Sequence, residues 1–85
     1  MVEKSVVIEL KSGLQARPAA EFVQLANRFS SEIFIDKDEK RVNAKSIMGV
    51  MSLAIASGDS IIIIADGSDD ETALLELINF VSVAS

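Results

Sequence analysis

Apolar residues alternate with polar ones near the start of the chain, and further along they recur at helical spacing. Val6, Ile8 and Leu10 have a period of two, which predicts a strand with one face on a core. After a loop that contains Gly13, apolar positions repeat every three or four residues and predict an amphipathic helix over about residues 16–29. The buried stripe of that helix is predicted to comprise Ala19, Phe22, Val23, Ala26 and Phe29.

The middle of the chain predicts a β-hairpin built from residues 32–36 and 40–43. In its first strand, Ile33 and Ile35 face the core and Phe34 faces away. The polar run between the strands is short enough for a turn, but it lacks the Asn-Gly or Asp-Gly pair that two-residue hairpins favour. The pattern therefore predicts the hairpin without defining its turn.

Two helices and one apolar strand follow the hairpin. Residues 46–53 predict a short helix that turns Val50 towards the core, and residues 60–66 predict a strand that is apolar on both faces. Gly67 ends this strand, and residues 68–71 predict a capping box with acidic residues in the first turn of a final helix. That helix extends to about residue 83, and its predicted buried stripe is Leu74, Leu77, Ile78 and Val81.

The predicted element order is strand, helix, strand, strand, helix, strand, helix. Strands on one side and helices on the other predict an α+β fold, a two-layer sandwich. No repeat, linker or low-complexity tract interrupts residues 1–85, so we expect one domain. A chain of this length buries only about 60–65% of the surface that it exposes when unfolded, which leaves little room for an enzyme cleft.

Composition removes several classes of function. The chain has neither histidine nor cysteine, so phosphohistidine, imidazole bases, disulfides and thiolate or imidazole metal sites are excluded. The acidic runs 36–39 and 69–71 lack the ligand spacing of a calcium loop. A net charge of −5 argues against binding to the nucleic-acid backbone and favours protein partners with basic surfaces. We expect no metal, no cofactor and no direct contact with nucleic acid.

Neither a membrane span nor an export signal is visible in the sequence. The longest apolar run, residues 61–65, is far shorter than the roughly 20 residues that a membrane helix needs. The first residues lack the basic and long apolar regions of a secretory signal. We therefore expect a cytoplasmic protein with no membrane partner.

Two segments could carry chemistry, and the first is the loop from Gly13 to Pro18. It leads into a helix N-terminus, where free amide groups and the guanidinium of Arg17 could hold an anion. An ordinary loop and helix start would explain the same residues. Gln15, within this loop, can donate and accept hydrogen bonds but is not a nucleophile.

The second segment is centred on Ser46, which stands beside Lys45 and follows Lys40 and Arg41 in the sequence. A serine at the start of a helix is typical of an N-cap. A phosphate at the same position would meet the positive end of the helix, so the fold would tolerate it. The cap and the phosphorylation site are alternative interpretations of one residue.

The apolar residues after Ser46 also have two interpretations. If Val50 faces the core, then Ile47, Met48 and Met51 cannot all face it as well. These three side chains could fill the core, or they could form an exposed docking surface beside a serine that can be charged.

Over essentially its whole length the sequence resembles HPr, the phosphocarrier family of the bacterial sugar phosphotransferase system. Residues 13–19 (GLQARPA) resemble the phosphohistidine loop of the family, and residues 43–53 (NAKSIMGVMSL) resemble its regulatory serine segment. The resemblance implies an open-faced two-layer sandwich with a four-stranded antiparallel sheet and three helices on one face. It also implies that phosphocarrier activity is absent, because Gln15 stands where the family has its histidine.

An intact serine segment combined with glutamine at the histidine position resembles one branch, the catabolite repression HPr-like proteins. The resemblance implies that an ATP-dependent HPr kinase/phosphorylase phosphorylates Ser46. The phosphorylated protein, which is not an enzyme, would then act as corepressor for a catabolite control protein of the LacI type. The partner-binding residues implied in this way are Arg17, Lys45, Ile47, Met48 and Met51.

Other functions remain open. A carrier of phosphate within the phosphotransferase pathway is disfavoured by Gln15 and the absence of histidine. In an interaction module that modulates a metabolic enzyme without phosphorylation, Ser46 would be only a helix cap. A small sheet of this kind could also exchange its N-terminal strand between two copies, so a homodimer is a further partner to consider.

Overall fold

The computed structural model describes residues 1–83 of the chain. Those residues form four strands and three helices in the order βαββαβα, which confirms the predicted order. None of the helices within them is long and apolar enough to cross a membrane. The elements are β1 (Val2–Val7), α1 (Ala16–Ala26), β2 (Glu32–Lys37), β3 (Lys40–Asn43), α2 (Ile47–Ser52), β4 (Ser60–Asp66) and α3 (Asp70–Val81).

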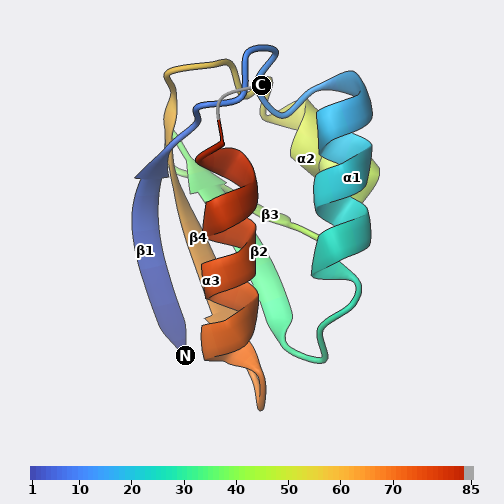
Figure 1. The fold of residues 1–85 in the computed structure, drawn as a ribbon, viewed down its shortest axis with the longest axis vertical. Coiled ribbons are helices and arrows are strands. Elements are labelled where there is room, and N and C mark those ends of the chain that lie inside the picture. The colour runs from blue at the N-terminus through green and yellow to red at the C-terminus, as the bar shows by residue number, and fades with distance from the viewer. Residues whose placement is uncertain (84–85) are drawn as a thin grey trace.

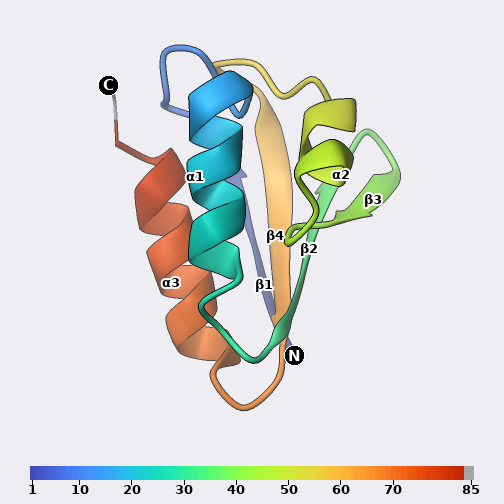
Figure 2. The ribbon, with the colours of Figure 1, turned by 90° about the vertical axis from the view of Figure 1, so that its right-hand side faces the viewer.

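The strands form one antiparallel sheet in the order β1-β4-β2-β3. The helices α1 and α3 lie side by side over one face of this sheet (Figure 1 and Figure 2), and α2 packs against α1 and β3. β4 lies between two strands and is apolar on both faces, as predicted. Ile61 and Ile63 join the core, and Ile64 on the other face is only 2% exposed. The predicted open-faced α+β sandwich is therefore confirmed.

The core lies between the sheet and the helices. Phe22 of α1 is fully buried, and its ring meets that of Phe80 edge to face at a centroid distance of 6.0 Å. The helix α1 ends at Ala26, earlier than predicted: Asn27 is its C-cap, and the next two N–H groups, of Arg28 and Phe29, bond three residues back instead of four. Of its predicted buried face, Ala19, Phe22 and Ala26 are fully buried, whereas Val23 and Phe29 are half-buried against the core.

The first strand also ends earlier than the alternating pattern predicts. β1 stops at Val7, although Ile8 and Leu10 are both buried. The N–H of Ile8 donates to the carbonyl of Asp59, and that of Glu9 donates to the carbonyl of Val81. The carbonyl of Ile8 also accepts from the N–H of Gly58, so Ile8 still bonds the residues before β4, and the backbone crosses to the end of α3 at Glu9. In this segment the period of two marks burial rather than strand pairing.

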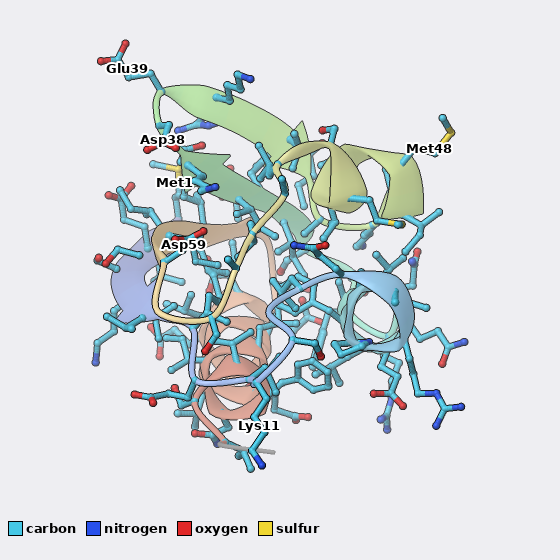
Figure 3. The ribbon with its side chains drawn as sticks, turned by 90° about the horizontal axis from the view of Figure 1, so that it is seen from above. Met1, Lys11, Asp38, Glu39, Met48 and Asp59 are labelled. Carbon is cyan, nitrogen blue, oxygen red and sulfur yellow. The ribbon has the colours of Figure 1, made fainter. Side chains whose placement is uncertain are left out.

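The hairpin between β2 and β3 has a two-residue turn at Asp38 and Glu39, at the edge of the molecule (Figure 3). Lys37 pairs with Lys40, and both turn residues have positive φ, 51° and 67°. Two left-handed residues match the twist of the strands, which is why Asn-Gly is favoured in such turns. Here two acidic residues adopt this conformation at some cost.

The predicted capping box before α3 is wrong. The helix begins at Asp70, its N-cap is Asp69 rather than Ser68, and the side chain of Asp69 makes no cap hydrogen bond. Its carboxylate instead accepts hydrogen bonds from the backbone N–H groups of Ser30 and Ser31, at 2.9 and 3.0 Å. Asp69 therefore joins the start of α3 to the loop before β2.

The buried face of α3 also differs in part from the predicted one. Ala73, Leu77 and Val81 are fully buried, whereas Leu74 and Ile78 are half-buried. The buried face of α3 is rotated towards Ala73, because its small side chain allows the helix to approach the sheet closely. The helix ends at Val81, with Ser82 as its C-cap.

Candidate functional site

Ser46 caps α2 and is exposed. Its hydroxyl oxygen accepts a hydrogen bond from the N–H of Gly49 at 3.1 Å, the geometry of an N-cap, and its backbone is extended with φ −108° and ψ 117°. Ser46 as a whole is an exposed residue. The cap interpretation is confirmed, and the exposed position is open to another protein.

The segment before Ser46 holds the hydroxyl in place. The side-chain oxygen of Asn43 accepts a hydrogen bond from the N–H of Lys45 at 2.8 Å, which forms a tight local turn. Ala44 is fully buried, and its N–H donates to the carbonyl of Ile33 in β2. The start of α2 is therefore fixed to the sheet by its own neighbours in the sequence.

Three apolar side chains of α2 are exposed. Ile47, Met48 and Met51 are 37%, 80% and 47% exposed, whereas Val50 is fully buried. Met48 points away from the body of the molecule (Figure 3). We call these three residues the α2 surface. They do not fill the core, so the second interpretation of the methionines, an exposed apolar surface beside Ser46, agrees with the structure.

The cations that precede Ser46 in the sequence do not surround its hydroxyl. The ammonium of Lys45 donates a hydrogen bond of 2.7 Å to the carbonyl of Phe29, just beyond the end of α1. Arg41 binds the carboxylate of Asp36 through two hydrogen bonds of 2.7 and 3.0 Å and lies over the ring of Phe34. The hydrogen bond from Arg41 lowers the pKa of Asp36. Lys45 and Arg41 are therefore both bound to groups other than the Ser46 hydroxyl.

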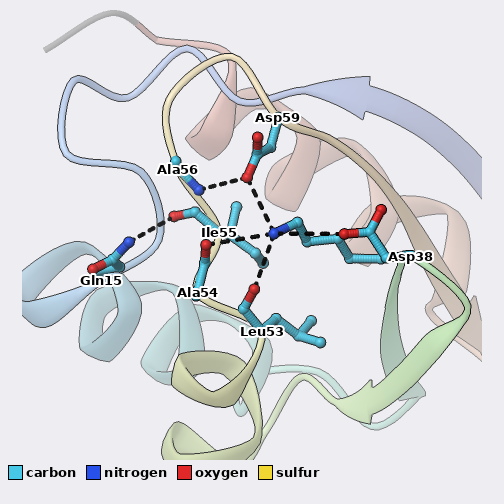
Figure 4. Close-up of polar contacts among 8 residues, drawn as sticks. Gln15, Asp38, Leu53, Ala54, Ile55, Ala56 and Asp59 are labelled. Carbon is cyan, nitrogen blue, oxygen red and sulfur yellow. Dashed lines mark hydrogen bonds and ion pairs between the residues drawn. The ribbon is translucent and has the colours of Figure 1, made fainter.

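The Gln15 loop forms the start of α1. Gln15 is the N-cap of this helix, but its side chain makes no cap hydrogen bond and its amide instead donates weakly to the carbonyl of Ile55 at 3.4 Å (Figure 4). Ala16 has a positive φ of 55°, which is strained for alanine. Arg17 is exposed. The loop thus presents an amide and a guanidinium to solvent.

The two candidate segments lie at opposite ends of α2. Gln15 contacts Ile55, which follows α2, whereas Lys45, which precedes α2, contacts Phe29 after the end of α1. The helices α1 and α2 consequently run in opposite directions (Figure 2). Arg17 in the first turn of α1 is placed towards the C-terminal end of α2, and Ser46 is at the other end.

Sequence reasoning missed a further group next to this site. The side chain of Lys37 crosses from the hairpin to the segment after α2, where its ammonium lies 3.0 Å from the carbonyl oxygen of Leu53 and 3.2 Å from the carboxylate of Asp59. Lysine in a polar turn is usually a solvated residue. Nothing in the local pattern marks this contact.

Comparison with known proteins places the fold and the two segments in a family. A family model described as the PTS HPr component phosphorylation site matches residues 2–82. The chain belongs to the HPr family. Within it, the chain is similar to the HPr-like protein Crh of Halalkalibacterium halodurans, with 65% identity over 81 residues, which cover 95% of this chain and 96% of the relative.

Solved structures agree with this assignment. A phosphocarrier protein HPr from Bacillus anthracis has a TM-score of 0.94 and 62% identity, with 95% of this chain and 96% of that chain covered. Crh from Bacillus subtilis, a catabolite repression protein whose crystal structure is an intertwined dimer with a swapping domain, has a TM-score of 0.77 and 57% identity. In that comparison 95% of this chain and 93% of the other are covered.

Proposed function

We propose that this chain is a regulatory protein of carbon catabolite repression, controlled by phosphorylation and without catalytic activity of its own. An ATP-dependent HPr kinase/phosphorylase phosphorylates Ser46, and the phosphorylated form binds a catabolite control protein of the LacI type as its corepressor. Similarity to two Crh proteins supports this class of function. The observation that carries the proposal is the exposed position of Ser46 beside the exposed apolar α2 surface.

A phosphate on Ser46 would change the surface without unfolding the helix. It adds about −1.5 to −2 charges at pH 7 and three acceptor oxygens. These oxygens would lie at the end of α2 where backbone N–H groups are free of partners within the helix, and negative charge is favoured there. The modification therefore creates an anion next to an apolar patch, and a partner needs both features for tight binding.

The partner must supply the cation that pairs with this phosphate. Lys45 already donates to Phe29, and Arg41 is bound to Asp36. The net charge of −5 likewise favours a partner with a basic surface. We assign the apolar contacts to Ile47, Met48 and Met51 and a separate polar contact to Arg17, and we assign to Lys45 the role of holding the segment in place.

The Gln15 loop supports regulation rather than phosphate transfer. A neutral carboxamide cannot accept a phosphoryl group as a histidine does, and the chain contains no histidine elsewhere. In this proposal Arg17 keeps a binding role, whereas Gln15, whose amide donates weakly to the carbonyl of Ile55, contributes little to the shape of the loop.

The decisive experiment combines intact mass spectrometry with a binding assay. Wild type, Ser46→Ala and Ser52→Ala are incubated with the HPr kinase/phosphorylase and ATP, and each product is titrated with the catabolite control protein. Ser52 is a matched control because it is an exposed serine of the same helix, whose hydroxyl donates to the carbonyl of Gly49. We expect one phosphate on wild type and Ser52→Ala, none on Ser46→Ala, and binding only by the phosphorylated proteins.

A second candidate function is an interaction module that modulates a metabolic enzyme without phosphorylation. The observation that favours it is that Met48 and Met51 are exposed before any modification. If Ser46→Ala and wild type, both treated with the kinase, bind the catabolite control protein equally well, this second function replaces the first. If no phosphate appears on wild type, the assignment of Ser46 as the modified residue is wrong.

We also propose that the chain can form a homodimer through β1. This strand lies at one edge of the sheet and pairs only with β4 within residues 1–83. Solved dimers of Crh from Bacillus subtilis and of HPr from Thermoanaerobacter tengcongensis support the proposal. Light scattering at several protein concentrations measures the dimer fraction, and a monomer at every concentration would contradict it.

A further inference from the structure

The ammonium of Lys37 occupies a site lined by oxygen atoms. It lies 3.0 Å from the carbonyl oxygen of Leu53 and 3.4 Å from that of Ala54. The carboxylate of Asp59 is 3.2 Å away and that of Asp38 is 3.9 Å away. The side chain of Lys37 is only 17% exposed, whereas that of Asp38 is 82% exposed. Two carbonyl groups and Asp59 are therefore the main partners of a largely desolvated ammonium (Figure 4).

The two carbonyl groups belong to the C-terminal end of α2. Leu53 is the C-cap of the helix, and Ala54 follows it with a positive φ of 48°. The last carbonyl groups of a helix have no partner within the helix and favour a cation. Lys37 supplies that cation from a hairpin 16 residues earlier in the chain.

Asp59 closes the loop that follows. Its carboxylate accepts a hydrogen bond of 2.8 Å from the N–H of Ala56 and pairs with the ammonium of Lys37. The hydrogen bond from Ala56, followed by that from Lys37, lowers the pKa of Asp59. The loop therefore carries a stable negative charge against the ammonium at neutral pH.

The next carbonyl group turns to the other side of the segment. The oxygen of Ile55 accepts hydrogen bonds from the N–H of Leu14 at 3.0 Å and from the side chain of Gln15 at 3.4 Å. Three successive carbonyl groups, of residues 53–55, thus join the hairpin, the end of α2 and the Gln15 loop (Figure 4). Lys37 holds two of the three.

We propose that Lys37 is a positioning residue whose ammonium acts as an internal cation and fixes the end of α2 that carries Met51 relative to the Gln15 loop. The oxygen site it fills is specific for a primary ammonium, because each N–H has an acceptor. When Lys37 is shortened to alanine, the site takes a small alkylammonium ion in its place. The role in docking rests on the proposed function, whereas the ammonium site itself does not.

Amide hydrogen exchange of the full chain tests the ammonium site. In Lys37→Met, which keeps the apolar stem, we expect exchange at Leu14 and Ala56 to accelerate about tenfold, the loss expected for one charge-assisted hydrogen bond. Lys40→Met is the matched control in the same hairpin and leaves these rates unchanged. Unchanged rates in Lys37→Met would overturn the proposal.

Chemical rescue separates a specific site from a general effect of charge. Propylammonium has the three carbon atoms and the ammonium group that Lys37→Ala removes, so it should restore slow exchange in that variant. It should have no effect on Lys37→Met, because the methionine side chain already fills the space. Tetramethylammonium and sodium chloride at equal ionic strength should not restore it. Rescue by all three salts would indicate screening and would overturn the site. If Lys37→Met does not fold, Lys37→Arg replaces it: this variant keeps the charge but not the primary ammonium, so exchange at Leu14 and Ala56 should still accelerate, and wild-type rates would overturn the site.

A binding assay tests the role in docking. Phosphorylated Lys37→Met should bind the catabolite control protein about tenfold more weakly than phosphorylated wild type, and propylammonium should restore binding in Lys37→Ala. Equal binding by both proteins would overturn the docking role. If phosphorylated wild type itself does not bind, the proposed function fails, and the exchange measurements still decide the ammonium site.

Discussion

The Gln15 loop and the Ser46 segment both lead into a helix, but they are held in different ways. Ser46 caps its helix with its own hydroxyl, through a hydrogen bond to the residue three positions later. Gln15 makes no such bond, and its side chain reaches Ile55, 40 residues away. The cap of α2 is therefore closed by a local contact, although Ala44 and Lys45 also join the segment to β2 and to Phe29. The Gln15 loop depends on the rest of the fold.

This difference determines which side chain each segment can change without losing its structure. A loop whose shape is maintained from outside can change its reactive residue and remain intact, since Gly13 and Leu14 keep their contacts with the segment after α2. At Ser46, the atom that closes the helix is the atom that would be modified. Resemblance to a motif therefore does not show which chemistry has been kept, and the contacts of each residue are needed.

The largest effect should come from Gly13→Ala, which breaks the outside support of the Gln15 loop. Gly13 has a φ of 68°, and a Cβ atom there would lie 2.2 Å from the carbonyl oxygen of Ile55. We expect the free energy of unfolding to fall by about 2–4 kcal/mol, measured by urea denaturation. Gly58→Ala is the matched control, because Gly58 also has a positive φ but has open space around it, and about 1 kcal/mol is expected there. Equal losses would show that contact with Ile55 does not support the loop.

The next effect compares the two N-caps directly. Ser46→Ala removes the hydrogen bond to Gly49 and should cost about 1 kcal/mol, the usual effect of losing a cap. Gln15→Ala removes only a long, partly buried contact of 3.4 Å and should change stability by less than about 0.5 kcal/mol. Thermal and urea unfolding of both variants measure the difference. A larger loss for Gln15→Ala would reverse the comparison.

A smaller effect of opposite sign is expected at Ala16. Its φ of 55° is unfavourable for alanine and free of strain for glycine, so Ala16→Gly should raise the free energy of unfolding by about 0.5 kcal/mol after the entropy of glycine is included. Ala20→Gly, at an exposed position within α1, should instead lower it by about 1 kcal/mol. Destabilisation by both would mean that the backbone of Ala16 is not strained.

The smallest effect depends on pH and concerns Asp59 in the loop that supports Gln15. Its pKa in the folded protein lies below the ordinary value of 3.8, so the unfolded chain binds the proton more readily. Its contribution to stability is present above pH 3.8 and is lost as the pH falls through the lowered pKa. The difference in stability between wild type and Asp59→Asn should therefore shrink on acidification. A difference that stays constant down to pH 2 would show that the contacts from Ala56 and Lys37 do not favour the ionised carboxylate.

Elements with strong local patterns could be predicted from the sequence. β4 has the bounds that its apolar run indicates, and Ser46 caps a short helix with Val50 in the core. The same reasoning showed that the three residues of the α2 surface cannot all be buried together with Val50, but it left open whether they fill the core, and the structure shows that all three are exposed. These features depend on residues close together in the chain.

Contacts between distant segments could not be predicted in this way. Asp69 reads as part of a capping box, yet it binds the backbone 38 and 39 residues earlier. Lys37 reads as a turn residue, yet it binds carbonyl groups 16 and 17 residues later. Local sequence cannot distinguish a solvated charge from one that links two loops, because the partner is brought near only by the packing of the whole chain.

Because α1 and α2 run in opposite directions, the surface around α2 carries two distinct polar groups, one near each end of the helix. Ser46 is at one end of α2, a helix of six residues with a length of roughly 9 Å, and Arg17 is placed towards the other end. In the proposed function the charge at Ser46 is present only after phosphorylation, whereas the charge of Arg17 is permanent. A partner that contacts both groups would therefore bind tightly only when two charges of opposite sign are present at these two ends.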